Sequence, residues 1–274
     1  MELPFTKMHG AGNDFIMIND MQERCRLTRE AIAGLCSRRR GVGGDGLILI
    51  HPGRSCDFTM RYYNSDGGEA DMCGNGARCA AAFAFETGIA GRTMSFETRS
   101  GIVGAEIANG SVRVSIGDVR ALKLGMRIAA SDRPVHYGIC GVPHAVIVVE
   151  DVREPSHDEF VRFAAPVRRD AAFGEAGANV NIVAVSDRGR CAYRTYERGV
   201  ENETDACGTG AVVIAAVIAH LGLVDPPVRC MTRGNDILDV ALEKTPGGAT
   251  SCLLTGPVAV SFRGTFYLEG YEHP

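Results

Sequence analysis

The chain has 274 residues, of which 45% are hydrophobic and 23% are charged, an ordinary balance for a globular protein of one large or two medium domains. Its formal net charge of -4 gives no reason to expect a nucleic-acid partner or binding to an acidic membrane surface. No uninterrupted apolar run approaches the ~20 residues of a transmembrane helix, and residues 1–15 contain no apolar signal-peptide core, so we expect no membrane partner and a cytoplasmic location.

Alternation of apolar and polar residues predicts many strands, and longer apolar periodicity predicts a few helices. The expected strands are residues 46–51, 57–63, 111–117, 144–151, 180–186, 191–197 and 258–269. The expected helices are residues 27–39 with Thr28 as the capping residue, 76–88, 156–170 and 210–222. The second and fourth helices are apolar nearly all round and end at a glycine, which predicts helices buried within sheet.

One pattern occurs twice along the chain: a strand, a polar loop, the motif Cys-Gly-x-Gly and an apolar helix. Residues 62–85 read YYNSDGGEADMCGNGARCAAAFAF, and residues 196–220 read YERGVENETDACGTGAVVIAAVIAH. The repeat predicts two similarly built domains that face one another, with a boundary near Gly117–Asp118. It also singles out Cys73 and Cys207, each expected where a helix begins.

The other cysteines have apolar or amphipathic surroundings. A disulfide framework would require a secreted protein, and the chain contains no C-x-x-C pair of the kind that zinc sites use. We therefore expect small buried hydrophobic side chains at Cys25, Cys36, Cys56, Cys140, Cys191, Cys230 and Cys252.

A glycine-rich segment at residues 41–46, GVGGDG, fits the dinucleotide-binding pattern G-x-G-x-x-G in letters only. That pattern requires a strand before it and a helix after it, whereas here a helix end precedes and a strand follows. We therefore reject a dinucleotide site. The chain also lacks a Walker A motif and the zinc-protease motif H-E-x-x-H.

The position of the two cysteines suggests acid–base chemistry. A helix N-terminus favours the thiolate and lowers the pKa of a cysteine from its usual value of about 8.5, and the uncovered amides of the following glycines bind carboxylates. Two such sites facing one another would hold two bases on opposite sides of a carbon next to a carboxylate. That arrangement suits inversion of the carbon without a metal or organic cofactor. A redox disulfide, or one nucleophile beside a structural cysteine, remains possible on this chemistry alone.

Several motifs together resemble the diaminopimelate epimerase family over nearly the whole chain. They are MHGAGNDF, RRRGVGGDGLIL, YYNSDGGEADMCGNGARC, GVPHAV, GANVNIV, YERGVENETDACGTGA and LTGPV. The resemblance implies a cofactor-independent isomerase that converts L,L-2,6-diaminopimelate to the meso form in lysine and peptidoglycan-precursor biosynthesis. It also implies that the protein forms a homodimer and that it acts on a small amino-acid substrate.

The resemblance implies an α/β (α+β) fold with two pseudo-symmetric domains. Each would be a closed, barrel-like sheet around a central buried helix. The expected domains are residues 1–117 and 118–262, with residues 263–274 completing the first sheet and the active site in the cleft between the domains.

The same resemblance implies roles for the residues of the two motifs. Cys73 and Cys207 look like the catalytic acid and base, one in each domain. Gly74–Asn75 and Gly208–Thr209 look like the groups that hold the reacting carboxylate. His144, in GVPH, looks like a histidine that supports the catalytic residues.

Other polar residues resemble substrate-binding groups. Asn13 would contact the substrate, and Asn64, Asn179 and Arg198 would recognise its distal amino-acid end. An arginine suits a distal carboxylate because it can donate two parallel hydrogen bonds. Glu197 would lie near the reacting ammonium and support catalysis.

The chain departs from the family pattern at three positions. Val142 replaces the asparagine of the common GNPH sequence, and Gly46 replaces a common glutamine, which removes two polar groups. Asp205, two residues before Cys207, places a negative charge near the thiol. These departures bear on the substrate more than on the reaction. A racemase for another amino acid, such as proline, 4-hydroxyproline or histidine, is therefore the alternative, although proline racemases usually carry a different first cysteine motif.

Overall fold

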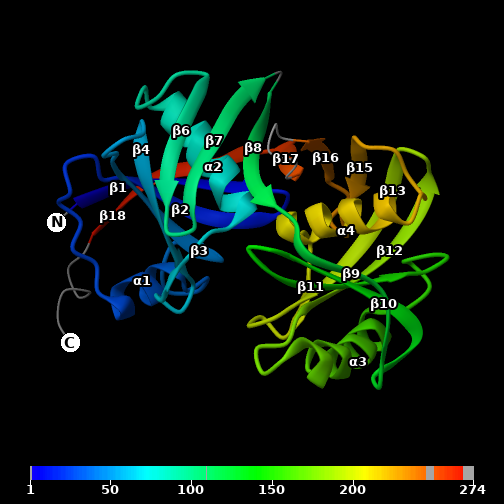
Figure 1. Ribbon diagram of the computed structural model, residues 1–274. Coiled ribbons are helices and arrows are strands. Elements are labelled where there is room, and N and C mark those ends of the chain that lie inside the picture. Colours follow the sequence, from blue (N-terminus) through cyan, green and yellow to red (C-terminus); the bar gives the residue numbers. More distant parts are fainter. Residues whose placement is uncertain (1, 109, 245–249, 268–274) are drawn as a thin grey trace. The chain divides into compact units, whose positions relative to one another are not determined.

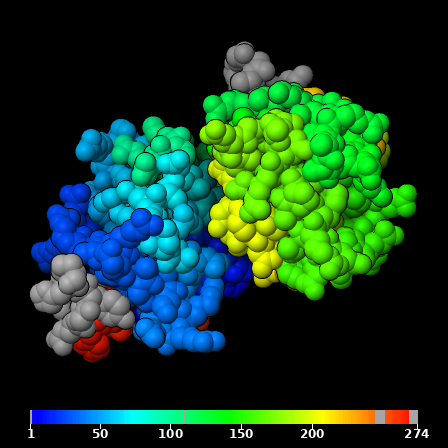
Figure 2. Space-filling model, turned by 90° about the horizontal axis from the view of Figure 1, so that it is seen from below, coloured from blue at the N-terminus to red at the C-terminus, as the bar shows by residue number. Residues whose placement is uncertain are grey.

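The computed structural model of the protein describes residues 2–108, 110–244 and 250–267 (Figure 1). The chain divides into two compact units: unit 1 comprises Met1–Val114 with the segment from Gly256 onward, and unit 2 comprises Ser115–Thr255. In Figure 2, unit 1 is mainly blue and cyan, whereas unit 2 is mainly green and yellow. Both units contain many strands and few helices, which confirms the predicted α/β class.

Unit 1 is a sheet with two helices. Its strands are β1 (Glu2–Gly10), β2 (Asn13–Asn19), β3 (Gly46–Pro52), β4 (Phe58–Asn64), β5 (Glu69–Ala70), β6 (Thr93–Thr98), β7 (Gly101–Ala108) and β18 (Ala259–Tyr267), and its helices are α1 (Arg29–Cys36) and α2 (Gly74–Glu86). Two strands cross between the units and pair with one another, β8 (Ser111–Asp118) and β17 (Thr250–Pro257).

Unit 2 has the same kind of composition. Its strands are β9 (Arg120–Ile128), β10 (Ser131–Cys140), β11 (Val142–Val148), β12 (Asn179–Asp187), β13 (Arg190–Glu197), β14 (Asn202–Thr204), β15 (Val228–Met231) and β16 (Ile237–Lys244). Its helices are α3 (His157–Arg168), the short 3₁₀ helix η1 (Ala171–Phe173) and α4 (Gly208–His220).

The two units share one strand topology. In unit 1 the order is β18-β1-β2-β3-β4-β6-β7-β8-β17. In unit 2 the order is β9-β10-β11-β12-β13-β15-β16-β17-β8. The first and last strands of each order are consecutive in the chain: β17 and β18 in unit 1, and β8 and β9 in unit 2. This is the order expected around a closed sheet.

The parallel pairs explain why helices occur where they do. Parallel strands require a crossover connection, commonly a helix. The parallel pairs β2–β3 and β4–β6 are joined through α1 and α2, and the pairs β11–β12 and β13–β15 are joined through α3 and α4. The second crossover of each unit begins with a cysteine motif, so the sequence repeat is also a topological repeat.

Helices α2 and α4 are the buried helices that the sequence predicts. Helix α2 contacts β1, β2, β3, β4 and β7, and helix α4 contacts β10, β11, β12, β15 and β16. Nearly every side chain from Gly74 to Ala84 is buried, as are those from Gly210 to Ile218. Both helices end before a left-handed glycine, Gly88 (φ +72°) or Gly222 (φ +73°), as expected.

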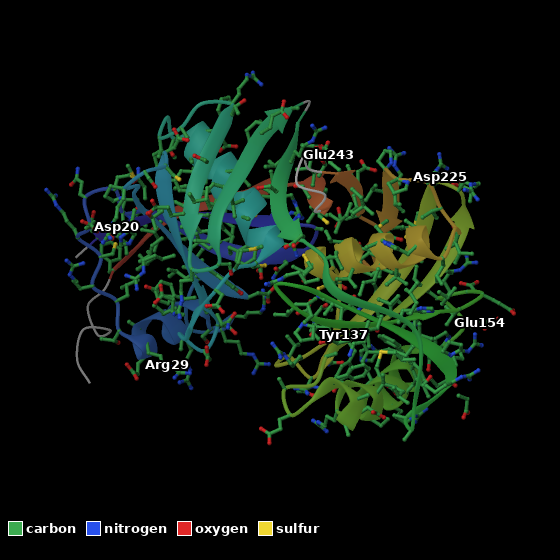
Figure 3. The ribbon with its side chains drawn as sticks, in the orientation of Figure 1. Asp20, Arg29, Tyr137, Glu154, Asp225 and Glu243 are labelled. Carbon is green, nitrogen blue, oxygen red and sulfur yellow. The ribbon has the colours of Figure 1, made fainter. Side chains whose placement is uncertain are left out.

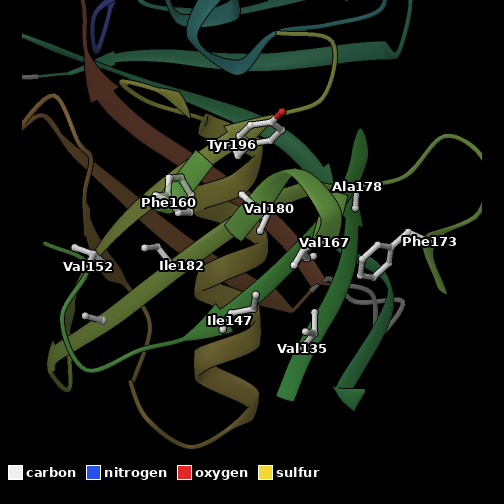
Figure 4. Packing of buried hydrophobic residues seen from close by; sticks show 13 residues of the cluster. Val135, Ile147, Val152, Phe160, Val167, Phe173, Ala178, Val180, Ile182 and Tyr196 are labelled. Atoms are coloured by element: carbon white, nitrogen blue, oxygen red, sulfur yellow. The ribbon is translucent and has the colours of Figure 1, made fainter. Parts of the chain in front are cut away.

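The outer helices α1 and α3 cover further apolar clusters. Helix α1 packs Ile32 and Leu35 against residues of β1, β2 and β3, and its Thr28 accepts a hydrogen bond from the Ala31 amide as an N-cap. Figure 4 shows the corresponding cluster of unit 2, in which Phe160 and Val167 of α3 lie with strand residues such as Ile182. Burial of each such side chain stabilises the fold by about 1.5–3 kcal/mol.

All seven predicted strands form, and the four predicted helices form with small shifts of their ends; residues 268–269 of the last predicted strand lie outside the described residues. The motif helices begin at Gly74 and Gly208, two residues earlier than expected. One expectation was wrong, because Cys56 is half-buried in the loop before β4 whereas the other six cysteines of that group are buried. Among the described helices, none is both long and apolar enough to span a bilayer.

Candidate active site

Cys73 occupies the N-cap of α2, as the sequence predicts. Its backbone is extended (φ -135°, ψ 124°), and its carbonyl accepts the first helical hydrogen bond from the Ala77 amide at 2.7 Å. The first-turn amides of a helix carry the positive end of its dipole, which favours an anion beside them. The half-exposed thiol therefore lies at the electropositive tip of a buried helix.

Asn13 connects this thiol to β2. Its Nδ2 donates to Asp45 Oδ2 at 2.8 Å, and because a carboxylate only accepts here, the other end of the amide must be the oxygen. That oxygen accepts from Cys73 Sγ at 3.4 Å and from Asn75 Nδ2 at 3.3 Å. The structure thus brings together three of the residues singled out in unit 1.

A charged cluster supports the Asn13 loop. The Arg38 guanidinium contacts both Asp14 and Asp45 at 2.8 Å, and Lys7 Nζ lies 2.7 Å from Asp14 Oδ2. Burial alone would raise the pKa of Asp14, but the hydrogen bonds from Arg38 and Lys7 hold it well below its usual range. Asp14 therefore stays ionised, and the hydrogen bond to Asp45 keeps Asn13 in the orientation described above.

A buried arginine lies beneath the first turn of α2. Arg78 is fully buried and donates from Nη2 to Asn75 Oδ1 at 2.8 Å and from Nη1 to the Gly74 carbonyl at 3.3 Å. It fixes the side chain of Asn75 and adds positive charge below the helix tip. The motif CGNGARC contains this arginine, but apolar periodicity gave no reason to single it out.

Asn64 ends β4, as predicted. Its Oδ1 accepts from Tyr62 Oη at 2.7 Å. The loop that follows is held by Arg29 (labelled in Figure 3), whose Nε donates to the Asp66 carbonyl at 3.1 Å. Gly67 (φ +79°) packs so closely on the Arg29 backbone that a Cβ would clash with it.

Cys207 is the N-cap of α4 and repeats the geometry of Cys73. Its backbone is extended (φ -127°, ψ 109°), and its side chain is buried. Tyr193 of β13 holds the position, because its hydroxyl donates to the Cys207 carbonyl at 2.9 Å and accepts from the Cys207 amide at 3.4 Å. Sequence reasoning missed this tyrosine, which lies on a predicted strand with no motif of its own.

His144 lies within reach of the first turn of α4. Its Nε2 is 3.1 Å from Thr209 Oγ1, which in turn is 3.6 Å from Cys207 Sγ. Burial lowers the pKa of His144 to about 3, and the positive charge of Arg198 adds to this effect. The imidazole is therefore neutral at physiological pH.

The remaining polar residues of unit 2 lie at adjoining strand ends. Asn179 is opposite His144 in the parallel β11–β12 pair, and its Oδ1 accepts from the Arg198 amide at 2.8 Å. Glu197 Oε1 accepts from Thr204 Oγ1 at 2.9 Å. Asn179 thus fixes the backbone that carries the Arg198 side chain.

Each cysteine follows an aspartate by two residues, and each aspartate contacts an arginine. Asp71 Oδ1 lies 3.2 Å from Arg99 Nε, and Asp205 Oδ1 lies 3.5 Å from Arg233 Nη1. Both aspartates are largely exposed. The arginine offsets the negative charge that the sequence places near each thiol.

The two departures that remove a polar side chain have different surroundings. Gly46 lies opposite Asn64 in the β3–β4 pair, and a Cβ there would lie 2.5 Å from the Tyr63 carbonyl and 2.7 Å from the Tyr62 ring. A longer side chain at Gly46 would therefore displace Tyr62. Val142 is half-buried at the start of β11, after a turn at Gly141.

In chemical terms, each unit presents a thiol, an amide-rich helix tip and a set of fixed polar side chains. Within the described residues, no three His, Cys, Asp or Glu side chains are grouped as metal ligands would be. A thiol beside the free amides of a helix tip can exchange a proton with a substrate whose carboxylate those amides hold.

Comparison with known proteins identifies relatives over almost the entire chain. The family model for diaminopimelate epimerase matches residues 5–122 and 138–252. The diaminopimelate epimerase of Aquifex aeolicus is 36% identical over 99% of this chain and 100% of its own length. The enzyme of the same name from Methanothrix thermoacetophila is 37% identical over 96% of this chain and 95% of its own.

Solved structures share the fold at low identity. A PhzF-family phenazine biosynthesis protein of Bacillus anthracis superposes with a TM-score of 0.75 at 15% identity, over 97% of this chain and 99% of its own. A hydroxyproline epimerase of Agrobacterium vitis, solved with trans-4-hydroxy-L-proline, gives a TM-score of 0.70 at 14% identity, over 96% and 92% of the two chains. These likenesses establish a fold with two pseudo-symmetric domains.

Proposed function

The chain belongs to the diaminopimelate epimerase family and is an epimerase, and from this we propose that it inverts one α-carbon of L,L-2,6-diaminopimelate to give the meso form. The observation that carries the proposal is the repeated helix tip. Each unit places a cysteine at the N-cap of a buried helix, directly before Gly-x-Gly. A reaction that needs an acid and a base on opposite faces of one carbon would use such a pair.

The proposed reaction moves two protons and changes no oxidation state. One cysteine thiolate removes the α-proton and becomes a thiol. The other cysteine, initially a thiol, gives its proton to the opposite face of the same carbon and becomes a thiolate. The two thiols thus exchange protonation states in each turnover, and we propose that Cys73 and Cys207 share one substrate in this way.

The helix tips would stabilise the charge that develops in the transition state. Loss of the α-proton shifts negative charge onto the reacting carboxylate, where preorganised amides are most effective. We assign that role to the amides of Gly74–Asn75 and Gly208–Thr209. Asn13 would contact the same end of the substrate, and Glu197 would lie near its ammonium group.

The distal amino-acid end requires separate recognition. Arg198, whose backbone is fixed by Asn179, would bind the distal carboxylate through two parallel hydrogen bonds. Asn64 and Asn179 would complete recognition of that end. The proposal also includes two domains, residues 1–117 and 118–262, with residues 263–274 returning to the first domain and the substrate bound between the two. It further includes a homodimer and a cytoplasmic location.

A second candidate is a racemase or epimerase of another amino acid. Gly46 and Val142 supply no polar side chain where many relatives have one, and the fold is shared with an enzyme solved with trans-4-hydroxy-L-proline. Because the Arg198 region remains available for a distal carboxylate, we favour the longer substrate.

A substrate panel separates the two candidates. The reduced protein should invert L,L-diaminopimelate, measured by chiral chromatography, and leave L-proline, trans-4-hydroxy-L-proline and L-histidine unchanged. Cys73→Ala and Cys207→Ala should each abolish turnover. Conversion of a monocarboxylic amino acid in place of diaminopimelate would support the second candidate, and full activity in either variant would refute the two-cysteine mechanism.

A further inference from the structure

The ends of three neighbouring strands in unit 1 carry polar side chains at one edge of the sheet. Strands β2 and β3 are parallel and begin at Asn13 and Gly46, and β4 is antiparallel to β3 and ends at Asn64. Gly46 lies opposite Asn64, and Asp45, the residue before Gly46, accepts from Asn13 Nδ2 at 2.8 Å. Asn64 therefore lies at the same edge as Asn13, which accepts a hydrogen bond from Cys73.

Tyr62 belongs to the face of this sheet that helix α2 covers. Side chains alternate between the two faces along a strand, so Met60 and Tyr62 share one face of β4. On that face Met60 approaches α2 so closely that a Cβ at Gly76 would lie 3.3 Å from Met60 Cε. Tyr63 belongs to the other face, where it packs in the apolar cluster of α1. Tyr62 thus points to the side of the sheet on which α2 begins after its N-cap, Cys73.

Gly46 leaves room for the Tyr62 ring. A Cβ at Gly46 would lie 2.7 Å from Cε2 of that ring. The ring also meets the Phe15 ring edge to face, with centroids 5.9 Å apart and planes at 80°, which is a favoured arrangement of two aromatic side chains. The half-buried ring of Tyr62 is therefore held between neighbours, and its hydroxyl has a defined position.

That hydroxyl holds the side chain of Asn64. Tyr62 Oη donates to Asn64 Oδ1 at 2.7 Å. The backbone of Asn64 is fixed as well, because its amide donates to the Gly68 carbonyl and its carbonyl accepts from the Gly67 amide, both at 2.9 Å. Since Tyr62 binds the oxygen end of the Asn64 amide, the NH₂ end of this exposed side chain is directed away from the tyrosine.

We propose that Tyr62 is a positioning residue for substrate binding: its hydroxyl holds Asn64 so that the amide NH₂ donates to the distal carboxylate of the substrate. The inference rests on the proposed epimerisation of diaminopimelate, in which Asn64 recognises the distal amino-acid end. It adds the polarity of that recognition. An NH₂ group donates to a carboxylate, whereas it cannot accept from an ammonium group.

The acidic side chains of residues 65–70, which follow Asn64, are each paired with an arginine. Asp66 pairs with Arg29, and Glu69 Oε1 lies 2.9 Å from Arg61 Nε. Each arginine offsets the charge of its partner, so these carboxylates oppose a substrate carboxylate less than unpaired ones would. The local charges are therefore compatible with the polarity that Tyr62 gives to Asn64.

The first test compares two adjacent tyrosines of β4. Tyr62→Phe keeps the ring and removes the hydroxyl, so KM for L,L-diaminopimelate should rise about fivefold, as expected for loss of one hydrogen bond. The value of kcat should change by less than about twofold, because the distal contact is the same in the bound substrate and in the transition state. Tyr63→Phe, the same change on the other face, is the matched control and should leave KM unchanged. An unchanged KM in Tyr62→Phe, or a loss confined to kcat, would refute the proposal.

A second variant tests the polarity of Asn64. Asn64→Asp retains an oxygen for the Tyr62 hydroxyl but replaces the NH₂ group by a carboxylate oxygen. KM should rise by about tenfold or more, because two like charges would then face one another. A lower KM would show that the substrate ammonium lies opposite Asn64, and an unchanged KM would show that no charged end of the substrate lies there. Either result would overturn the proposal.

A measurement without substrate separates this inference from the proposed function. In protein labelled with ¹⁵N-asparagine, the Asn64 side-chain NH₂ should be as ordered as the backbone by its ¹H–¹⁵N nuclear Overhauser effect, and it should become mobile in Tyr62→Phe. Equal mobility in the two proteins would refute the positioning role, even in an active enzyme. An ordered Asn64 amide in a protein that does not invert diaminopimelate would refute the proposed function but not the positioning of Asn64.

Discussion

At the scale of single residues, the last glycine of each Cys-Gly-x-Gly motif has a different neighbour. A Cβ at Gly76 would lie 3.0 Å from Ile48 Cδ1 and 3.3 Å from Met60 Cε, the mobile ends of long side chains. A Cβ at Gly210 would lie 2.8 Å from Asn181 Oδ1 and 3.2 Å from Cys207 Sγ. Glycine at this motif position thus leaves room for apolar side chains in unit 1 and for a polar network in unit 2.

The polar network of unit 2 connects Asn181 to His144. Asn181 Nδ2 lies 3.3 Å from His144 Nδ1, and Asn181 Oδ1 accepts from Thr195 Oγ1 at 2.8 Å. All three residues are buried.

This difference predicts unequal effects of two matched substitutions. Gly76→Ala should retain most activity, because the side chains yield and alanine favours a helix interior by roughly 0.5–1 kcal/mol over glycine. Gly210→Ala should displace Asn181 and lower kcat by about tenfold or more, since it disturbs the partners of His144 and Cys207 directly. Kinetics of the two variants, with unfolding curves as a control for stability, would test this, and equal losses would contradict it.

The buried neutral His144 predicts a pH dependence of stability. Its folded pKa of about 3 lies below the unfolded value of about 6.5, so the unfolded state binds a proton that the folded state refuses between these values. The free energy of unfolding should therefore fall with pH below about 6.5, by roughly 2 kcal/mol between pH 7 and 5 from this residue alone. Urea unfolding followed by circular dichroism would measure it.

Comparison of two histidine variants isolates that contribution. His144→Gln should reduce the difference in unfolding free energy between pH 7 and 5, whatever it does to stability at pH 7. His220→Gln, at an exposed position on α4, should leave the difference unchanged. An identical pH dependence in the wild type and His144→Gln would show that this histidine is not buried neutral.

The roles of several of these residues could not be predicted from the sequence, for a physical reason. Asn181 and Thr195 stand in strands that the sequence predicts; Asn181 is a polar residue between apolar neighbours, whereas Thr195 follows the charged Arg194. For Asn181, between Val180 and Ile182, that contrast was the available signal. Which polar group on another strand each one meets depends on register, which alternation alone does not determine.

At the scale of elements, the start of α4 depends on a neighbouring strand. The Tyr193 hydroxyl, fully buried, bonds both the amide and the carbonyl of Cys207. Tyr193→Phe should lower the free energy of unfolding by about 1–3 kcal/mol, because buried backbone groups lose their partner. It should also lower kcat, because the sulfur that we propose as an acid–base group is no longer held in position.

A matched control is available on another strand. Tyr267 of β18 is 62% exposed, so Tyr267→Phe should change neither stability nor kcat measurably. The prediction for α4 fails if Tyr193→Phe behaves like Tyr267→Phe in both urea unfolding and steady-state kinetics.

Helices were more predictable than strands. The four predicted helices follow from apolar periodicity, and Thr28 caps the first of them as expected. The capping box at Ser156 is seen in the structure and was not predicted. Strands such as β9, in which exposed residues predominate, carry little alternation, and they were missed. Strand β1 was also missed, and it contains a buried lysine, Lys7, that pairs with Asp14 and interrupts the apolar pattern.

At the scale of the whole molecule, the duplicated motif predicted more than any single element. Strand, cysteine, glycines and buried helix recur together in the two units, with a parallel crossover in each. Distant segments of the chain also pair, such as β18 with β1. The sequence contains no local signal for such long-range pairing.

The shared-substrate proposal predicts coupled protection of the two helix tips. In the inactive Cys207→Ala variant, addition of meso-diaminopimelate should slow hydrogen exchange at the first-turn amides of both α2 and α4, because one ligand would cover both. Exchange followed by mass spectrometry gives the answer for each helix separately. Protection confined to one helix would mean that the two cysteines do not share a substrate.

The most direct test of the two-cysteine account is the fate of the α-hydrogen in deuterated water. At early times the meso product should carry one solvent deuterium at the inverted carbon, while recovered L,L-diaminopimelate should retain its protium, because one thiolate removes the proton and a different, solvent-exchanged thiol delivers its replacement. Product that keeps the original hydrogen at the inverted carbon would show return of the same proton by a single base and would contradict the central claim.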